Sequence, residues 1–352
     1  MKINKGNYSL NSGIDKLSFN LKRGRGHLLF FLIDRFKWHF YPRFHKVSKF
    51  PSHVDVEISS ICNMKCPMCY TITAEFKKSV KTGLMHFNLF KKIIDECVKY
   101  NVYSIRLSLR GESFLHPRIF DMIKYAKEKG IKEVSTLTNN LALNPGKFKK
   151  LVELELDWLT ISFDGLGKTY ESIRKPAKFK DSFNMIKKYH QIKKEMNCLK
   201  PVIKVQSVWP AIKNNPKKYY NTFSSYVDMV ASNPLIDYLR KDEDIEYEEN
   251  FVCPVLYQRL VIGSDGKVLL CSNDERGLYI VGDVNKQSLY SVWHGKKLNK
   301  ARNLHLKHQG IKKLKPCKVC YLPRKTRKQN ILINNRNTLI EKYTKRTEVI
   351  GK

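Results

Sequence analysis

Three cysteines that fall within eight residues constrain the fold of this chain more than any other feature. They are Cys62, Cys66 and Cys69, in the spacing C-x3-C-x2-C. Three thiolates on one tight loop can bind three irons of a cubane iron–sulfur cluster, which leaves the fourth iron without a protein ligand. A cluster that only transfers electrons normally has four cysteine ligands. The spacing therefore indicates an open iron where a second molecule binds and reacts, much as an open position marks a catalytic zinc site.

Structural zinc and disulfide bonding are the alternative uses of these cysteines. Structural zinc sites close with a fourth Cys or His, usually in paired C-x2-C units. Disulfides need an oxidising compartment. The chain has nine cysteines, an odd number, and no secretory signal is visible, which predicts a cytoplasmic protein. The open-site cluster is the favoured interpretation.

Strand and helix patterns alternate along the chain after this loop begins. β-branched apolar runs predict strands, and apolar residues at helical spacing predict the helices between them. The expected strands cover residues 54–58, 103–109, 134–137, 158–163, 202–208 and 226–230, and two of the helices cover 87–98 and 116–129. Cys97 falls in the first helix and is expected to be a core residue. Polar motifs follow the strands, as on the catalytic face of a βα barrel. We therefore expect an α/β fold built on a partial (β/α)6 TIM-like barrel with right-handed crossovers.

The cysteine loop and the strand-end motifs together resemble the radical S-adenosylmethionine (SAM) superfamily. Cys62, Cys66 and Cys69 stand where that family has its cluster-binding cysteines, and Gly111-Glu112 matches its Gly-Gly-Glu motif. The resemblance implies a SAM-binding [4Fe–4S] cluster and S-adenosyl-L-methionine as cofactors. It also implies an enzyme that cleaves SAM reductively to a 5′-deoxyadenosyl radical, which abstracts a hydrogen from the substrate. A one-electron reductase such as flavodoxin or ferredoxin would supply the electron.

The same resemblance implies which residues contact SAM. The backbone of Met68 would contact the adenine, and Gly111-Glu112 would receive the amino group. Ser162 and Gln206 would contact the ribose. Arg174 would bind the SAM carboxylate, a role that suits a planar two-pronged donor. No single residue is identified as a general acid or base.

Three positions depart from the family pattern. Arg110 replaces the first glycine of Gly-Gly-Glu, and Ser113 replaces the proline that often follows the motif. Arg110 is compatible with SAM binding if only backbone atoms contact SAM there. Asn140 replaces the glycine of Thr-Asn-Gly, and Asn is the residue that best substitutes for Gly in a left-handed conformation.

A second set of cysteines lies in the C-terminal third and consists of Cys253, Cys271, Cys317 and Cys320. An Asp-Gly turn at 265–266 between β-like runs predicts a hairpin before Cys271. The segment resembles the SPASM/twitch auxiliary-cluster domain, with further matches at Gly282-Asp283-Val284, Leu289, Trp293 and Arg302. The resemblance implies a second, auxiliary [4Fe–4S] cluster, and a four-Cys zinc ribbon is the alternative. A full SPASM domain has seven cysteines and two clusters. No cysteine follows Cys320, so a further cluster is not expected.

Charge and composition divide the chain into five expected parts. These are a basic N-terminal extension over residues 1–50, the barrel over 51–236, an acidic linker over 237–249, the auxiliary domain over 250–322 and a basic tail over 323–352. The net charge is +34, to which residues 1–50 contribute +9 and residues 311–352 contribute +11. Such patches attract anionic partners, including nucleic acid, an anionic membrane surface or phosphorylated sugars. A lysine-rich composition with solvated termini is the plain alternative.

The N-terminal extension contains one segment with interfacial character. Residues 27–41 combine aromatic side chains with flanking Lys and Arg, as a helix peripheral to a membrane does. No apolar run reaches the length that a transmembrane helix needs.

The sequence is compatible with more than one class of substrate. Relatives with one auxiliary cluster include dehydrogenases of amino-cyclitols, and fuller SPASM relatives modify peptides. Our first hypothesis is an oxidoreductase that oxidises or rearranges a sugar-like or other small polar metabolite. A peptide-modifying maturase is the second hypothesis. A non-catalytic metal-binding module that recruits anionic partners is the third.

Overall fold

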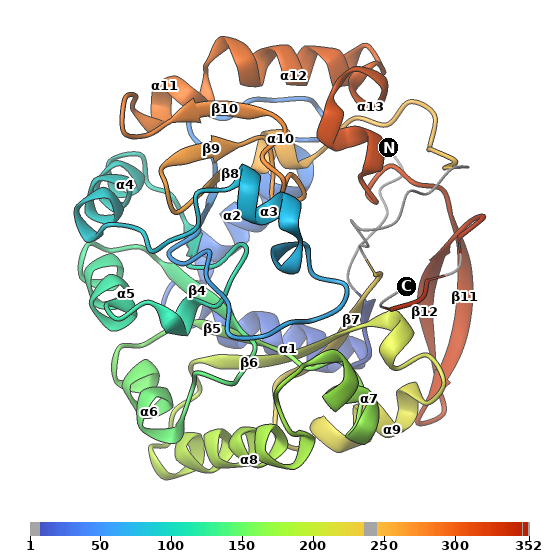
Figure 1. Cartoon of the computed structure of the whole chain (residues 1–352). Helices are drawn as coiled ribbons and strands as arrows, with labels where there is room; N and C mark the ends of the chain where they lie inside the picture. The colour runs from blue at the N-terminus through green and yellow to red at the C-terminus, as the bar shows by residue number, and fades with distance from the viewer. Residues whose placement is uncertain (1–7, 236–244, 347, 351–352) are drawn as a thin grey trace.

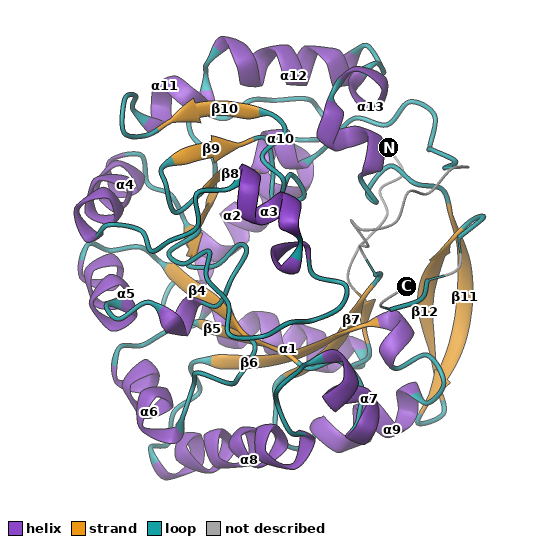
Figure 2. Ribbon diagram, in the orientation of Figure 1, coloured by secondary structure: helices purple, strands orange, loops and turns teal. Residues whose placement is uncertain are grey.

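Six parallel strands, taken in chain order, form the centre of the sheet in the computed structural model, which describes residues 8–235, 245–346 and 348–350. They are β2 (His53–Val56), β3 (Ser104–Arg106), β4 (Glu133–Thr138), β5 (Trp158–Ser162), β6 (Val202–Val208) and β7 (Met229–Asn233). The sheet curls into an open barrel, and the helices lie around its outside (Figures 1 and 2). The expected α/β class and partial TIM-like barrel are confirmed.

The outer helices follow from the apolar spacing in the sequence. They are α4 (Phe87–Lys99), α5 (Ile119–Glu128), α6 (Pro145–Glu153), α8 (Phe179–Glu195) and α9 (Pro216–Phe223). In α4 the buried positions are Phe90, Ile93, Ile94 and Cys97, a stripe with helical period that faces the sheet. The helix predicted over residues 87–98 and the core position of Cys97 are therefore confirmed.

Several element boundaries differ from those predicted, and β7 shows the clearest reason. The strand expected over 226–230 begins only at Met229, because Tyr226 forms a turn in which its N–H donates to the Phe223 carbonyl at 2.9 Å. Asp228 then accepts a hydrogen bond from the backbone N–H of Ile203 at 2.8 Å. The hydrogen bond between Asp228 and Ile203 therefore fixes the end of the turn, and β7 begins at the next residue.

Strand β4 is one residue longer at each end than the predicted 134–137, whereas other elements are shorter than predicted. The strands expected over 54–58 and 103–109 end at Val56 and Arg106. The helix expected over 116–129 begins at Ile119, since the His116 ring accepts a hydrogen bond from the Arg118 N–H at 3.1 Å and Pro117 lies between them.

The C-terminal segment continues the barrel sheet. Strand β8 (Arg259–Ile262) pairs in parallel with β2, and β9 (Lys267–Leu269) and β10 (Ile280–Asp283) follow in antiparallel order. The predicted hairpin turn joins β8 to β9, where Gly266 has a φ of 84° that favours glycine. The sheet thus has ten strands, with the short β1 (Tyr8–Ser9) at the far edge beside β7. Cys62, Cys66 and Cys69 follow β2, and Cys271 follows β9, whereas Cys317 and Cys320 lie at η4 (Lys315–Val319), outside the sheet. The five domain boundaries remain predictions.

The basic tail and the acidic linker are paired with each other. Strands β11 (Thr326–Ile333) and β12 (Arg336–Tyr343) form a two-stranded hairpin, which lies beside α9 at the right of Figure 1. Residues 237–244 of the linker lie outside the described residues. In its described part, the Glu246 carboxylate forms an ion pair with Lys345 at 2.9 Å. This part of the linker thus packs on the tail and is not a solvated spacer.

The N-terminal extension packs against the barrel through two helices, α1 (Gly13–Gly24) and α2 (Leu28–Phe40), which lie behind the sheet in Figure 1. The Arg23 guanidinium donates two hydrogen bonds to the carboxylate of Glu133 at 3.0 and 2.9 Å. Both side chains are buried. A bidentate pair of this kind fixes the angle at which α1 meets the first residue of β4.

A buried arginine holds together the core of the C-terminal segment by hydrogen bonds to two backbone carbonyls. Arg302, on α12 (Lys296–Leu306), donates to the backbone carbonyls of Leu256 at 3.0 Å and Trp293 at 2.8 Å. Its guanidinium lies 4.3 Å from the centroid of the Trp293 ring. The arginine and tryptophan singled out in the sequence therefore form one packing unit beside the second cysteine set.

We expect Arg302→Met to lower the free energy of unfolding by about 2–3 kcal/mol, because two buried carbonyls lose their donors. Lys300→Met, on an exposed position of the same helix, should change it by less than about 0.5 kcal/mol. Urea denaturation followed by circular dichroism measures both. Equal losses in the two variants would contradict the packing role of Arg302.

Candidate functional site

The cysteine loop follows β2 at the carboxyl end of the parallel strands, in front of the barrel opening in Figure 1. A turn brings its cysteines together, because the N–H of Cys69 donates to the carbonyl of Cys66 at 3.0 Å. Cys66 is buried, and Cys62 and Cys69 are half-buried. Burial raises the pKa of all three thiols, and each is raised further by another cysteine of the set. The three thiols therefore form one electrostatically coupled group.

Two neighbouring segments hold this loop in place. The N–H of Glu112 donates to the Ile61 carbonyl at 2.7 Å, and the N–H of Lys65 donates to the Lys175 carbonyl at 3.1 Å. Gly111 has a φ of 59°, and a Cβ at this position would lie 2.6 Å from the Ser59 carbonyl oxygen. The second glycine of the Gly-Gly-Glu motif is thus required by backbone contact with the loop.

Glu112 connects the ends of two strands. Its buried carboxylate accepts hydrogen bonds from the Thr138 hydroxyl at 2.8 Å and the Asn139 N–H at 2.7 Å. Burial raises the pKa of this carboxyl, and the backbone N–H groups of Asn139 and Phe114 lower it. Glu112 therefore braces the β4 end, and its predicted contact with the SAM amino group remains a prediction.

The Thr138-Asn139-Asn140 segment has the conformation that the sequence suggested. Asn140 has a φ of 71°, so it occupies the left-handed conformation that glycine takes in related sequences. The side-chain amide of Asn139 lies 3.7 Å from the Cys62 sulfur. Sequence reasoning gave Asn139 no role, although its position directly after a parallel strand was the available signal.

The residues predicted to bind the rest of SAM lie on the next strands. Ser162 and Gln206 are direct neighbours in register at the ends of β5 and β6. Arg174, which follows α7 (Gly167–Ile173), forms an ion pair with Asp164 at 2.5 Å, and its positive charge partly offsets the rise that burial causes in the pKa of Cys66. The Nε of Arg174 is buried without a hydrogen-bond partner among the described residues. A carboxylate at this position would satisfy that donor, so the site fits the predicted ligand.

Arg110, the main departure from the family motif, forms a buried ion pair with Glu57. Its Nε and Nη2 donate to the two Glu57 oxygens, each at 2.6 Å. Its Nη1 donates to the Glu275 carbonyl at 3.0 Å, and the Ser264 N–H donates to Glu57 at 3.0 Å. These contacts link the residue that precedes the cysteine loop to the loop that follows Cys271. The expectation that only backbone atoms remain for SAM at this position is compatible with this arrangement.

The four C-terminal cysteines line one apolar pocket together with Phe251, Leu256, Leu270, His305 and Leu322. Burial raises the pKa of Cys253 to about 12 and of Cys320 to about 11. Thiolates form in such surroundings when a bound metal replaces the proton. His305 was missed from the sequence, yet its Nε2 lies 3.5 Å from the Cys317 sulfur. The sequence feature that could have indicated His305 was its position three residues after Arg302 on the same helix.

The two cysteine sets supply the numbers of thiols that cubane iron–sulfur clusters take. Three thiols on the first loop and four in the second pocket match an open and a closed cubane cluster, respectively.

Comparison with known proteins agrees with both sites. The Radical SAM superfamily profile matches residues 56–201, and the profile of the SPASM iron–sulfur cluster-binding domain matches residues 253–321. A tungsten-containing aldehyde ferredoxin oxidoreductase cofactor-modifying protein of Pyrococcus furiosus is 31% identical over 141 residues, which are 36% of this chain and 38% of that protein. An Fe-coproporphyrin III synthase of Methanosarcina barkeri is 30% identical over 117 residues, 32% of this chain and 27% of that protein. The chain thus spans less than two fifths of these relatives.

Solved structures share the fold over most of the chain. BtrN in complex with AdoMet and 2-DOIA has a TM-score of 0.55 and 19% identity, and the match covers 78% of this chain and 94% of BtrN. SuiB of Streptococcus suis bound to S-adenosylmethionine has a TM-score of 0.54 and 13% identity, over 79% of this chain and 74% of SuiB. Among the described residues, none of the helices has the length and apolar character to cross a membrane.

We expect Glu57→Gln and Arg110→Met each to destabilise the protein by about 3–5 kcal/mol, because each leaves a buried group without its partner. The double variant should lose much less than the sum, with a coupling energy above about 2 kcal/mol in urea denaturation. The exposed pair of Arg118 and Asp121, 2.8 Å apart, is the control and should couple by less than about 1 kcal/mol. Additive losses at Glu57 and Arg110 would refute the link.

Proposed function

Because this chain belongs to the radical SAM superfamily and carries a SPASM iron–sulfur cluster-binding domain, we propose that it is an oxidoreductase that removes hydrogen from a small polar metabolite. The radical SAM domain implies a [4Fe–4S] cluster and SAM, and the SPASM domain implies auxiliary iron–sulfur chemistry. The proposal is carried by one observation: a three-cysteine loop follows β2 of the sheet, and four further cysteines line one separate pocket.

The protein's own residues have distinct roles in this proposal. Cys62, Cys66 and Cys69 would hold the SAM-binding cluster, and Arg174 would orient SAM through its carboxylate. When bound and reduced, the cofactors supply a 5′-deoxyadenosyl radical that abstracts a substrate hydrogen, and an acceptor for the electron that the substrate then loses. A substrate that fills the barrel cavity would displace water from this chemistry, which protects a radical from side reactions.

Three features favour oxidation of a small molecule. All four thiols of the second set face one pocket, so a cluster there would be fully ligated by cysteine and suited to electron transfer. The second feature is a cavity of about 760 Å³ inside the barrel, a volume typical of small-molecule sites. BtrN, whose fold this chain shares, was crystallised with AdoMet and 2-DOIA, and the share of BtrN covered is 94%.

Anaerobic reconstitution should give about eight irons per chain, the content of two [4Fe–4S] clusters. Dithionite and SAM should then yield 5′-deoxyadenosine and methionine. We expect Cys62→Ala to halve the iron content and abolish 5′-deoxyadenosine formation, because the SAM-binding cluster loses a ligand. Cys317→Ala should also lower the iron content while SAM cleavage persists.

Cys198→Ala, a half-buried cysteine outside both sets, is the matched control and should behave like the wild-type protein. An iron content near four that Cys317→Ala leaves unchanged would remove the second cluster from the proposal. Zinc alone, without SAM cleavage, would support the non-catalytic metal-binding hypothesis instead.

We also propose that the N-terminal helices bind an anionic membrane surface. Their outward faces expose large apolar side chains at Ile14, Leu17, Leu21, Leu28, Leu29, Phe30, Leu32, Ile33, Phe36 and Phe40, and Phe44 follows. Leu29 is 68% exposed and Phe30 is 55% exposed. Residues 1–50 carry a net charge of +9, which complements anionic lipid. Exposed apolar and basic side chains on one helix are the features of an interfacial segment.

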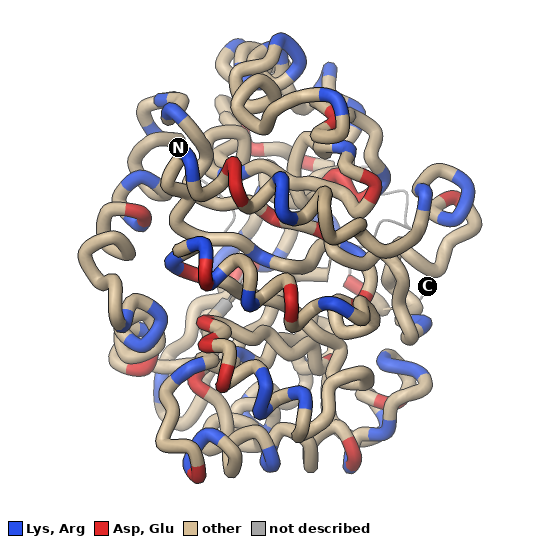
Figure 3. The backbone as a smooth tube through the Cα atoms, turned by 90° about the vertical axis from the view of Figure 1, so that its left-hand side faces the viewer, with Lys and Arg blue, Asp and Glu red and all other residues tan. Residues whose placement is uncertain are grey.

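Positive charge is not confined to the N-terminal helices, since residues 311–352 carry a net charge of +11. On the side of the molecule shown in Figure 3, Lys and Arg are spread over its whole height with Asp and Glu among them. The N-terminal helices are therefore distinguished by their exposed apolar residues rather than by charge alone.

Sedimentation with vesicles tests this surface. The full chain should bind phosphatidylglycerol vesicles and bind phosphatidylcholine vesicles at least five-fold less. Leu29→Ser with Phe30→Ser should lower the bound fraction at least five-fold, because apolar area available to the bilayer is lost. Leu339→Ser, on the exposed tail hairpin, is the control. Unchanged vesicle binding, or a dimer that the double variant dissociates, would contradict the membrane proposal.

A further inference from the structure

The cavity inside the barrel is lined by an excess of cations. Its Lys and Arg residues are Arg23, Arg35, Arg43, Arg106, Lys204 and Arg259. Glu133 is the acidic residue among the described residues that line it. The cavity is also lined by Gln206 and by Asn273, so it extends from the predicted ribose site to the loop after Cys271.

Three acidic side chains neutralise part of this charge. Glu133 pairs with Arg23, and Asp34 pairs with Arg35. Asp55 is shared, since Arg106 lies 2.9 Å and Arg259 lies 3.1 Å from its carboxylate oxygens. One carboxylate between two guanidiniums leaves the centre of the cavity with a net positive charge.

Lys204 adds a further cation to the lining of the cavity. Its side chain is on β6, is only 5% exposed and lines the cavity. Its ammonium lies 5.3 Å from the centroid of the Trp158 ring and has no hydrogen bond or ion pair among the described residues. Burial, together with the charges of Arg106 and Arg23, lowers the pKa of Lys204 to about 7. A buried ammonium without a partner is costly unless a ligand pairs with it.

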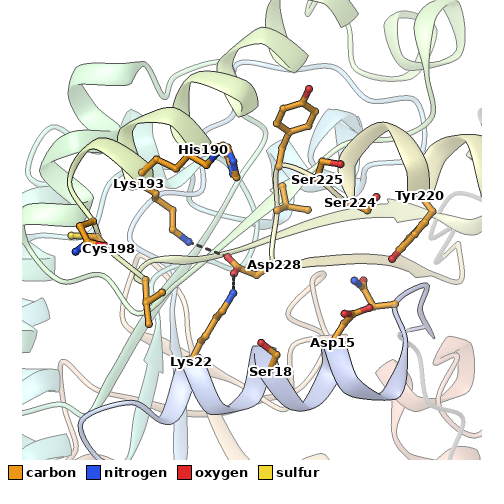
Figure 4. A pocket seen from close by; sticks show the side chains of 16 residues that line it. Asp15, Ser18, Lys22, His190, Lys193, Cys198, Tyr220, Ser224, Ser225 and Asp228 are labelled. Atoms are coloured by element: carbon orange, nitrogen blue, oxygen red, sulfur yellow. Dashed lines mark hydrogen bonds and ion pairs between the residues drawn. The ribbon is translucent and has the colours of Figure 1, made fainter.

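A half-buried lysine elsewhere in the protein does have a carboxylate partner. Lys193 is on α8, and its ammonium lies 3.1 Å from the Asp228 carboxylate, which also accepts from Lys22 at 2.7 Å. Figure 4 shows both lysines pointing at Asp228 across a groove that α1 helps to line. The half-buried Lys193 thus has a carboxylate partner, whereas the more deeply buried Lys204 has none among the described residues.

The position of Lys204 relates it to the proposed chemistry. Lys204 precedes Gln206 by two residues on β6, so both side chains are on the same face of the strand. The separation along the strand is roughly 7 Å, from about 3.3 Å per residue. A molecule that fills the cavity would thus have one end near the ribose site and the other near Lys204.

We propose that this cavity is the substrate site and that the substrate carries an oxyanion, a phosphoryl or carboxylate group, which Lys204, Arg106 and Arg259 bind. The bound anion supplies the negative charge that the lining lacks. Guanidinium groups donate in a planar fork that matches such oxygens, and the ammonium adds a point charge. Identifying the ligand as the substrate rests on the proposed function, whereas the anion site itself does not.

Calorimetric titration of the reconstituted full chain with sodium sulfate tests the site, with sodium chloride at matched ionic strength as the reference. Lys204→Met should weaken sulfate binding at least ten-fold. Lys217→Met removes an exposed lysine on α9 and should change the affinity less than two-fold. Circular dichroism checks folding, and Lys204→Met is expected to fold because it removes an unpaired buried charge.

The pH dependence gives a second readout. Sulfate keeps its charge between pH 6 and 9, so a change in its affinity reports on the protein. The ammonium form of Lys204 is present below its pKa of about 7, so sulfate affinity should be highest at pH 6 and fall as the pH rises. In Lys204→Met this loss should be much smaller. An affinity independent of pH in the wild-type protein, or equal in Lys204→Met and Lys217→Met, would overturn the proposal.

Acetate distinguishes the two anion classes. Tighter binding of sulfate than acetate supports a phosphoryl group, and the reverse supports a carboxylate, whereas binding of neither overturns the proposal. Sulfate binding through Lys204 without formation of 5′-deoxyadenosine would reject the proposed function and keep the anion site. 5′-Deoxyadenosine formation without sulfate binding would reject the anion site alone.

Discussion

The buried pair of Glu57 and Arg110 connects the two halves of this protein. Glu57 directly follows β2 and precedes the cysteine loop, and Arg110 follows β3 in the motif that supports the loop. Through the carbonyl of Glu275 and the N–H of Ser264, the same pair reaches the segment that carries Cys271. Desolvation makes a buried ion pair costly unless its remaining donors and acceptors are satisfied. Here the Glu275 carbonyl and the Ser264 N–H, both from the segment that carries Cys271, satisfy these donors and acceptors. The ion pair is therefore stable only when this segment packs against the barrel.

This connection gives the replaced glycine a physical meaning. A glycine at position 110 would leave Glu57 without its bidentate partner, and the charge would then be buried alone. The glycine that follows, Gly111, cannot vary in the same way, since a Cβ would lie 2.6 Å from the Ser59 carbonyl. The two adjacent positions therefore have opposite requirements: a long cation at one and no side chain at the other.

Much of the fold was predictable because local periodicity determines it. The outer helices and parallel strands follow from apolar spacing, and Asn140 was expected in the left-handed conformation that it adopts. Long-range partners could not be predicted in this way. Arg110 and Glu57 are 53 residues apart, and only the folded chain brings them together. Lys204 occupies an ordinary polar position in an alternating strand, and its lack of a carboxylate partner is visible only inside the barrel. The same holds for His305 beside Cys317, and for the tail, whose hairpin depends on pairing across a turn.

The central claim is that one iron on the Cys62, Cys66 and Cys69 loop is open to SAM while the second cysteine set forms a separate, closed centre. Electron paramagnetic resonance of the reduced, reconstituted full chain tests this most directly, because a ligand that binds to an iron changes the spectrum of that cluster. The account predicts two signals, of which SAM changes one, and a Cys62→Ala protein whose remaining signal does not respond to SAM. A spectrum that SAM leaves unchanged in the wild-type protein would contradict the account.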